Sequence, residues 1–120
     1  MPRDPFEYAV LRIVPRVERG EQLNVGVLLQ CRPRRYLGAR LELGAPRLAA
    51  LAALAPELDT AELEAHLDGI RRIVAGDASG GPIAALAAPE RFHWLVSPSS
   101  TIIQPSEVHT GLTDDPARSL

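Results

Sequence analysis

The sequence predicts a single α+β domain over residues 1–120, with an antiparallel sheet of about five strands and two main helices packed on one face. Three apolar runs with β-type alternation occupy the first 43 residues, two segments with helical spacing of leucine follow, and two more β-type runs come later. An apolar fraction of 46% with 23% charged residues is typical of a folded globular chain. A chain of 120 residues is long enough for one core and too short for two.

The first three strands are predicted at residues 6–14, 23–31 and 35–43. The first, FEYAVLRIV, is apolar on both alternating faces except at Glu7 and Arg12, which is typical of a strand inside a sheet. In the second, LNVGVLLQC, the odd positions from Leu23 to Cys31 share one face, and Gly26 indicates a bulge or a close approach by another segment. Short connections predict an antiparallel meander.

Two helices are expected next, at residues 46–55 and 59–76. In the first, leucines recur at helical spacing and Pro56 prevents continuation beyond Ala55. In the second, Asp59 and Glu62 fit a capping arrangement, and Gly76 can take the left-handed conformation that ends a helix. Residues 76–86 are expected to form a loop and an irregular segment; their glycines lack the Gly-Lys-Ser/Thr ending of a phosphate loop.

The C-terminal third is expected to complete the sheet. RFHWLVSP at residues 91–98 and STIIQP at residues 100–105 are interpreted as two short strands, with Trp94, Ile102 and Ile103 in the core. Gly111 in VHTGLTDDP would allow an unusual backbone conformation. One of the residues 113–115 can cap a final helix with Pro116 in its first turn.

Composition excludes several classes of protein. A net charge of −2 argues against general nucleic-acid binding, although residues 1–47 carry nine arginines and five acidic residues. A single cysteine, Cys31, excludes an internal disulfide and a four-cysteine zinc site, and its apolar surroundings predict a buried thiol. No signal-peptide core or membrane-spanning run is visible, so we expect a cytoplasmic protein that does not contact a membrane.

Polar residues near the first two strands form one half of a candidate site. If these strands form a hairpin, the side chains of Arg12, Arg16, Glu18 and Asn24 come together near its turn. An arginine within a buried strand is costly unless it is paired. The residues therefore predict either an arginine–glutamate pair that closes the hairpin or a site for an anion, and the pair is favoured.

The other half of the candidate site is C-terminal. It comprises His93, Ser97, Thr101, His109, Thr110 and Asp114. Histidine on a strand is usually a hydrogen-bonded packing residue, and no Gly-x-Ser-x-Gly element surrounds the serines. The phosphoesterases with two histidines carry His-x-Ser/Thr twice, whereas Leu95 and Gly111 stand at the third positions here. A metal site of His93, His109 and Asp114 is a weaker hypothesis, so no metal and no cofactor is expected.

Three blocks of this sequence resemble the bacterial family catalogued as domain of unknown function 3037. They are YAVLRIVPRVERGEQLNVGVLL, RRYLGARL and ERFHWLVSPSSTIIQPSEVHTGLTDDP, which together extend from about Tyr8 to Pro116. The matching positions are Arg12, Arg16, Glu18, Asn24, Gly26, His93, Trp94, Ser97, Thr101, His109, Thr110, Gly111 and Asp114. Relatives continue into a longer final helix, so the resemblance implies that the helix after Pro116 is truncated here.

The resemblance implies no activity, but it does imply a partner. Genes of that family often neighbour genes for proteins resembling the HipA-type serine/threonine kinases. We therefore expect a small accessory module that binds or regulates a partner protein, with a HipA-like kinase as the candidate. The alternative is a small enzyme or ligand-binding domain that acts on a phosphate ester or nucleotide. That alternative requires Arg12, Arg16, His93 and His109 to converge in one cleft.

Overall fold

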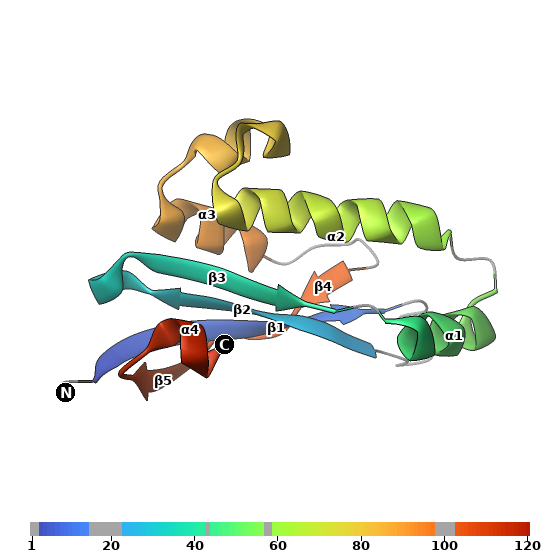
Figure 1. The fold of residues 1–120 in the computed structure, drawn as a ribbon, viewed down its shortest axis with the longest axis horizontal. Coiled ribbons are helices and arrows are strands. Elements are labelled where there is room, and N and C mark those ends of the chain that lie inside the picture. The colour runs from blue at the N-terminus through green and yellow to red at the C-terminus, as the bar shows by residue number, and fades with distance from the viewer. Residues whose placement is uncertain (1–2, 15–22, 43, 57–58, 98–102) are drawn as a thin grey trace.

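The computed structural model describes residues 3–14, 23–42, 44–56, 59–97 and 103–120. They form a five-stranded antiparallel sheet with helices α2 and α3 on one face (Figure 1), which confirms the α+β prediction. The strands are β1 Asp4–Ile13, β2 Leu23–Cys31, β3 Tyr36–Leu41, β4 Ile103–Pro105 and β5 His109–Thr113. The helices are α1 Ala45–Leu54, α2 Thr60–Ala75, α3 Ala88–Leu95 and α4 Pro116–Ser119, with short 3-10 turns η2 Arg32–Arg34, η3 Ala78–Gly80 and η4 Pro82–Ala85.

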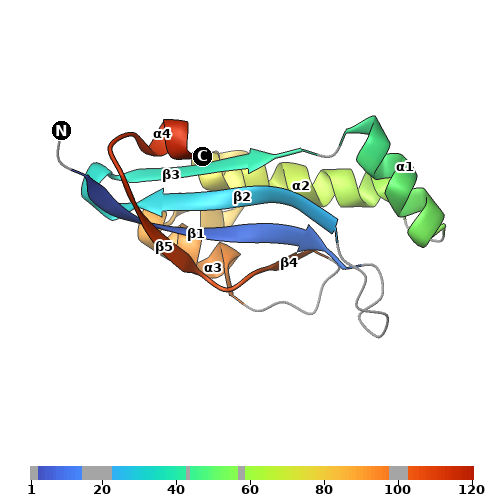
Figure 2. The same ribbon diagram turned by 90° about the horizontal axis from the view of Figure 1, so that it is seen from below.

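Strand β1 lies at the centre of the sheet. On one side it pairs with β2, which pairs in turn with β3, so the predicted meander is confirmed. On the other side its second half pairs with β4 and its first half with β5. The first strand of the chain and its C-terminal segment are therefore neighbours, as Figure 2 shows from below.

An extra residue in β2 changes which side chains share a face. Leu11 pairs with Gly26 but Arg12 pairs with Asn24, so Val25 has no opposite residue and forms a bulge. Val25 and Leu28 are both fully buried in the core between sheet and helices. The prediction that all odd positions of this strand share one face is therefore wrong, because the bulge reverses the alternation.

Gly26 is required by the close approach of β3. A Cβ atom added at Gly26 would lie 2.5 Å from the carbonyl oxygen of Arg40 and would also collide with Leu41. Both expectations for this glycine, a bulge nearby and a close segment, are confirmed.

A serine side chain joins the two C-terminal strands to β1. Pairing of β1 with β4 and with β5 differs in register by one residue, and Ser106 lies in the gap between them. Its amide donates to the carbonyl of Val10 at 2.7 Å, and its hydroxyl oxygen accepts from the amide of Val10 at 2.8 Å. The hydroxyl thus replaces a backbone acceptor, and β1 keeps its hydrogen bonds across the offset.

Helix α2 has the ends that the sequence predicts. The carboxylate of Asp59 accepts from the amides of Ala61 and Glu62 at 3.0 and 3.1 Å, and Gly76 ends the helix with φ 71°. Its buried stripe packs against the sheet with residues of β1, β2 and α3, and consists of Leu63, Leu67, Ile70 and Ile73. At roughly 2 kcal/mol for each buried aliphatic side chain, this stripe is a major source of stability. Helix α1 also ends before Pro56 as predicted.

Residues 91–95 belong to helix α3 and not to the predicted strand at residues 91–98, whose last residue lies outside the described residues. Phe92 and Leu95, three residues apart, are both buried in the core, which needs helical geometry. Pro89 in the first turn suits a helix start. Trp94, predicted to be core, lies on the outer side with half of its surface exposed, whereas Ile103 is buried as predicted and Ile102 lies outside the described residues.

Residues 109–113 form the fifth strand, β5, which the sequence did not predict. The backbone of Gly111 is not in the left-handed region, so the expected unusual conformation is absent there. Glycine is needed because a Cβ would lie 2.5 Å from the ring of Phe6, which packs across the strand pair. Asp115 caps α4 with Pro116 in its first turn, as predicted, and none of the described helices is long and apolar enough to cross a membrane.

Two glycine substitutions test the packing of the sheet. We expect Gly26→Ala to lower the free energy of unfolding by about 2–3 kcal/mol. The added methyl group would collide with the backbone carbonyl of Arg40, which cannot move without disturbing the pairing of β2 with β3. Gly69→Ala is the control: nothing lies within 4 Å of its added Cβ in the middle of α2, so it should raise stability by about 0.5–1 kcal/mol. Urea unfolding followed by circular dichroism measures both, and a Gly26→Ala variant as stable as the parent would contradict this register.

Candidate functional site

The face of the sheet turned away from α2 is the candidate functional site. We call it the open face, defined by Val10, Arg12, Asn24, Val27 and Arg40. Paired residues of antiparallel strands project to the same side, and these positions alternate with the core residues of β1 and β3. In Figure 2 α4 crosses this side of the sheet near one end, and α1 lies beyond the other end.

A shallow hollow of about 250 Å³ lies on the open face. Val10 and Val27, paired across β1 and β2, contribute apolar side chains to it. Arg40 of β3 and Arg47 of α1 contribute positive charge, and Glu42 contributes one carboxylate. The hollow therefore combines an apolar floor with a basic rim.

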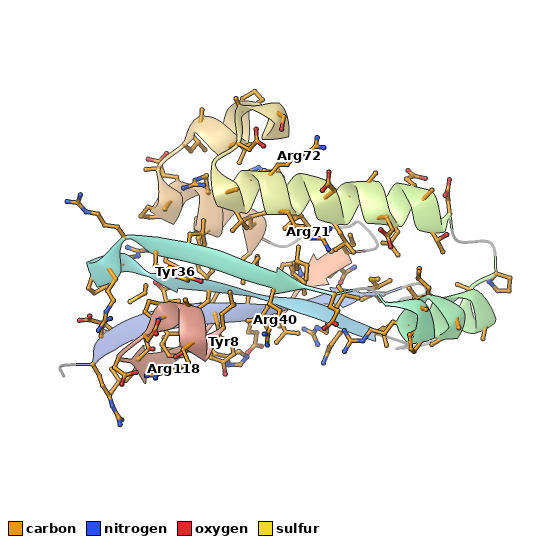
Figure 3. All side chains as sticks on the ribbon, viewed as in Figure 1. Tyr8, Tyr36, Arg40, Arg71, Arg72 and Arg118 are labelled. Carbon is orange, nitrogen blue, oxygen red and sulfur yellow. The ribbon has the colours of Figure 1, made fainter. Side chains whose placement is uncertain are left out.

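The two arginines at this rim differ in how they are held. Arg47 donates to the carbonyl oxygen of Glu42 at 3.0 Å, which fixes its side chain beside the hollow. The exposed guanidinium of Arg40 has no hydrogen bond or ion pair with any part of the chain that the structure describes. Figure 3 shows Arg40 below the sheet, on the same side as Tyr8, whereas Arg71 lies between α2 and β3. Arg40 is thus available to an external anion.

The C-terminal segment covers the opposite end of this face. Arg34 donates to the carboxylate of Asp4 at 2.7 Å and also to the carbonyl oxygen of Asp114. The bond to Asp4 raises the pKa of Arg34, and the hydrogen bond and charge of Arg118 lower the pKa of Asp114. These contacts fasten the turn before α4, and Cys31 is fully buried there, as expected. Asp114 therefore has a structural role in the turn between β5 and α4.

Three residues of the predicted site lie on the open side of the sheet. Arg12 and Asn24 are partners in the register of β1 and β2, as the hairpin prediction requires. His109 pairs with Tyr8 further along β1, and their rings lie 5.3 Å apart. Arg12 lies four residues further along β1 than Tyr8, which is about 13 Å. His109 and Arg12 thus share a face but lie well apart along it.

Other predicted residues are placed elsewhere. His93 and Ser97 belong to α3 and its end, on the helix-covered side, where the Ser97 hydroxyl donates to the carbonyl oxygen of His93 at 2.7 Å. Thr110 is exposed on β5 and pairs with Glu7. The single cleft of arginines and histidines that a phosphate-ester site would need is therefore not formed by Arg12, His93 and His109. Arg16, Glu18 and Thr101 lie outside the described residues.

The weaker metal hypothesis finds no geometric support. Within residues 3–14, 23–42, 44–56, 59–97 and 103–120, no group of three His, Cys, Asp or Glu side chains is placed to hold a metal ion. His93 and His109 lie on different sides of the sheet, and Asp114 is bonded to Arg118 at 3.0 Å. The three proposed ligands do not converge.

The family model described as "Protein of unknown function (DUF3037)" matches residues 8–120. The chain belongs to this family. Comparison with curated proteins and with solved structures gives no match. The match begins at Tyr8 inside β1 and includes β2 to α4, so it covers most of the sheet and all the described helices of this chain.

Sequence reasoning missed the arginine that marks the open face of this DUF3037 protein. Leu37, Ala39 and Leu41 pack on the core, so the alternation in β3 already assigns Arg40 to the other side. That signal was present in the predicted third strand. Arg47 carries no comparable signal, because its position depends on where α1 lies beyond the end of the sheet.

The separation of the two histidines can be tested by NMR. We expect Tyr8→Leu to shift the ring-proton resonances of His109, because the aromatic ring 5.3 Å away no longer contributes its ring current. The resonances of His93 should not change, and neither should those of His66, which is exposed on α2. A Tyr8→Leu spectrum in which His93 moves together with His109 would show that the two imidazoles share one environment, contrary to this structure.

Proposed function

We propose that this protein is a non-catalytic accessory module that binds an acidic partner protein through its open face. The observation that carries this proposal is the exposed guanidinium of Arg40, which lacks a partner among the described residues and borders an apolar hollow. Arginine beside apolar surface is the composition that protein interfaces favour. Charge at such a rim attracts an acidic partner and raises the rate of association.

The polar groups near the C-terminus support a binding role over catalysis. The hydroxyl of Ser97 donates to a backbone carbonyl and not to an imidazole, and the hydroxyl of Thr113 lies 2.6 Å from that of Ser119. The carboxylate of Asp114 pairs with Arg118. These bonds serve helix ends and turns, whereas an activated nucleophile needs a base within hydrogen-bond distance.

A HipA-like kinase is the partner that we propose. The neighbouring genes implied by the family resemblance support this choice, and the basic rim supports an acidic surface on the kinase as the contact. Binding to one face of a sheet leaves the α2 side of the module free in the complex.

Charge reversal at the open face tests this function. We expect Arg40→Glu to weaken binding to the kinase encoded by the neighbouring gene by about tenfold or more, because attraction becomes repulsion. Co-purification followed by titration calorimetry at two salt concentrations measures the change. Arg72→Glu, the matched control, makes the same change of charge on the outer side of α2, where Arg72 pairs with Asp68, and should bind as the parent does.

Two results would contradict the proposal. Equal binding by Arg40→Glu and the parent would exclude the open face as the contact surface. A monodisperse parent protein that does not bind the kinase at all would remove the kinase as the partner.

A further inference from the structure

A second hollow lies on the opposite side of the sheet, between the β2–β3 connection and the first turn of α3. Its volume is about 340 Å³, within the range of small-molecule sites. Gln30 forms its wall from the sheet, Ala88 and Pro89 from the helix, and Arg32 and Arg35 from the connection. Tyr36 borders it from the start of β3, but the ring of Tyr36 lies against Gly38 on the other side of the sheet. Apart from Gln30, Tyr36 and the arginine heads, these groups are apolar.

Gln30 is the observation that points to a ligand. Its side chain is 1% exposed, and its Oε1 has no hydrogen-bond partner within the described parts of the chain. The amide nitrogen of the same side chain faces Glu7 Oε1 at 3.4 Å, which sets the orientation of the amide. A buried acceptor without a donor is costly, so such groups are usually satisfied by a bound molecule or water. Gln30 is one of the residues that line the hollow, so a ligand bound there can supply the missing donor.

Positive charge surrounds the same hollow. Arg35 is exposed and its side chain has no ion pair or hydrogen bond with the residues that the structure describes, while Arg32 lies 3.4 Å from Glu7 and is 63% exposed. The first amides of α3 have no side-chain cap, since Ala87 stands at that position. Pro89 has no amide hydrogen and Glu90 adds a carboxylate to the same turn, so only the amides of Ala88 and Glu90 are open to an anion and Arg35 is the main positive group.

We propose that this hollow binds a small anion whose apolar or planar body carries an N–H donor. The N–H donates to Gln30 Oε1, the body packs on Ala88 and Pro89, and the carboxylate or phosphate lies between Arg35 and the start of α3. A nucleotide with an exocyclic amine and an N-acylated amino acid both have this chemistry. The site is separate from the open face, and the proposal does not depend on the proposed kinase.

Titration followed by ¹⁵N–¹H NMR tests the site, with adenosine 5′-monophosphate and N-acetyl-L-phenylalanine as probes and inorganic phosphate as the control. We expect at least one probe to give saturable shifts at Arg35, Ala88 and the Gln30 side-chain amide, with a Kd between about 10 μM and 1 mM. Saturation by one probe alone identifies the source of the ligand as nucleotide or acylated amino acid. No saturable shift with either probe, or binding of inorganic phosphate with equal affinity, overturns the proposal.

Two variants separate binding from folding. Gln30→Leu removes the orphaned acceptor with little change of volume and should weaken probe binding about tenfold. Arg35→Gly removes the guanidinium at a residue with φ 52°, where glycine is unstrained, so it should bind more weakly and remain folded even if Gln30→Leu does not. Unchanged affinity in Arg35→Gly would place the ligand elsewhere. Arg40→Glu should leave probe binding unchanged, which distinguishes failure of this site from failure of the open face.

Discussion

The pairing of β1 along both of its edges is the constraint on which the remaining structure depends. Its alternate side chains Ala9, Leu11 and Ile13 are buried, so its backbone groups must find partners within the protein. Strand β2, which is nearby in the chain, supplies the hydrogen-bond partners along one edge of β1. The partners along the other edge come from residues 103–113. Closing a loop of about 90 residues costs roughly 4 kcal/mol of chain entropy, which the backbone pairing and the burial of Ile103 must offset.

This topology also explains why the two faces of the sheet differ. After the edge strand β3, the chain has to reach the opposite edge at β4, and it crosses one face to do so. Helices α2 and α3 lie in that crossing and bury their apolar stripes on the sheet (Figure 1). The other face is reached only after β5, where the four residues of α4 cover part of it. Basic side chains on the remaining part can therefore stay in contact with solvent.

The sequence predicts those parts of the fold that depend on local pattern. Strands β1 to β3 have alternation and short connections, and α2 has its stripe, its Asp59 cap and its Gly76 end. Helix α3 was missed because Phe92, Trp94 and Val96 favour strands, although Pro89 followed by Glu90 was a signal of a helix start. Strand β5 was missed because VHTGLT is polar and pairs only through distant β1. The sequence predicted Arg12 and Asn24 as site residues. It could not identify Gln30, because only the structure shows that the side-chain oxygen of Gln30 is buried without a hydrogen-bond donor among the described residues.

The arrangement of β2 decides how the two proposed surfaces can influence each other. Val27 projects into the hollow of the open face, and Gln30, three residues later, projects toward α3. Exposed charges on opposite faces are screened over about 8 Å at physiological salt, so direct electrostatic coupling between Arg40 and Arg35 is weak. Coupling would need a shift of β2 itself, and the core contacts of Val25 and Leu28 on either side of Gly26 oppose it. The structure therefore favours two surfaces that bind independently.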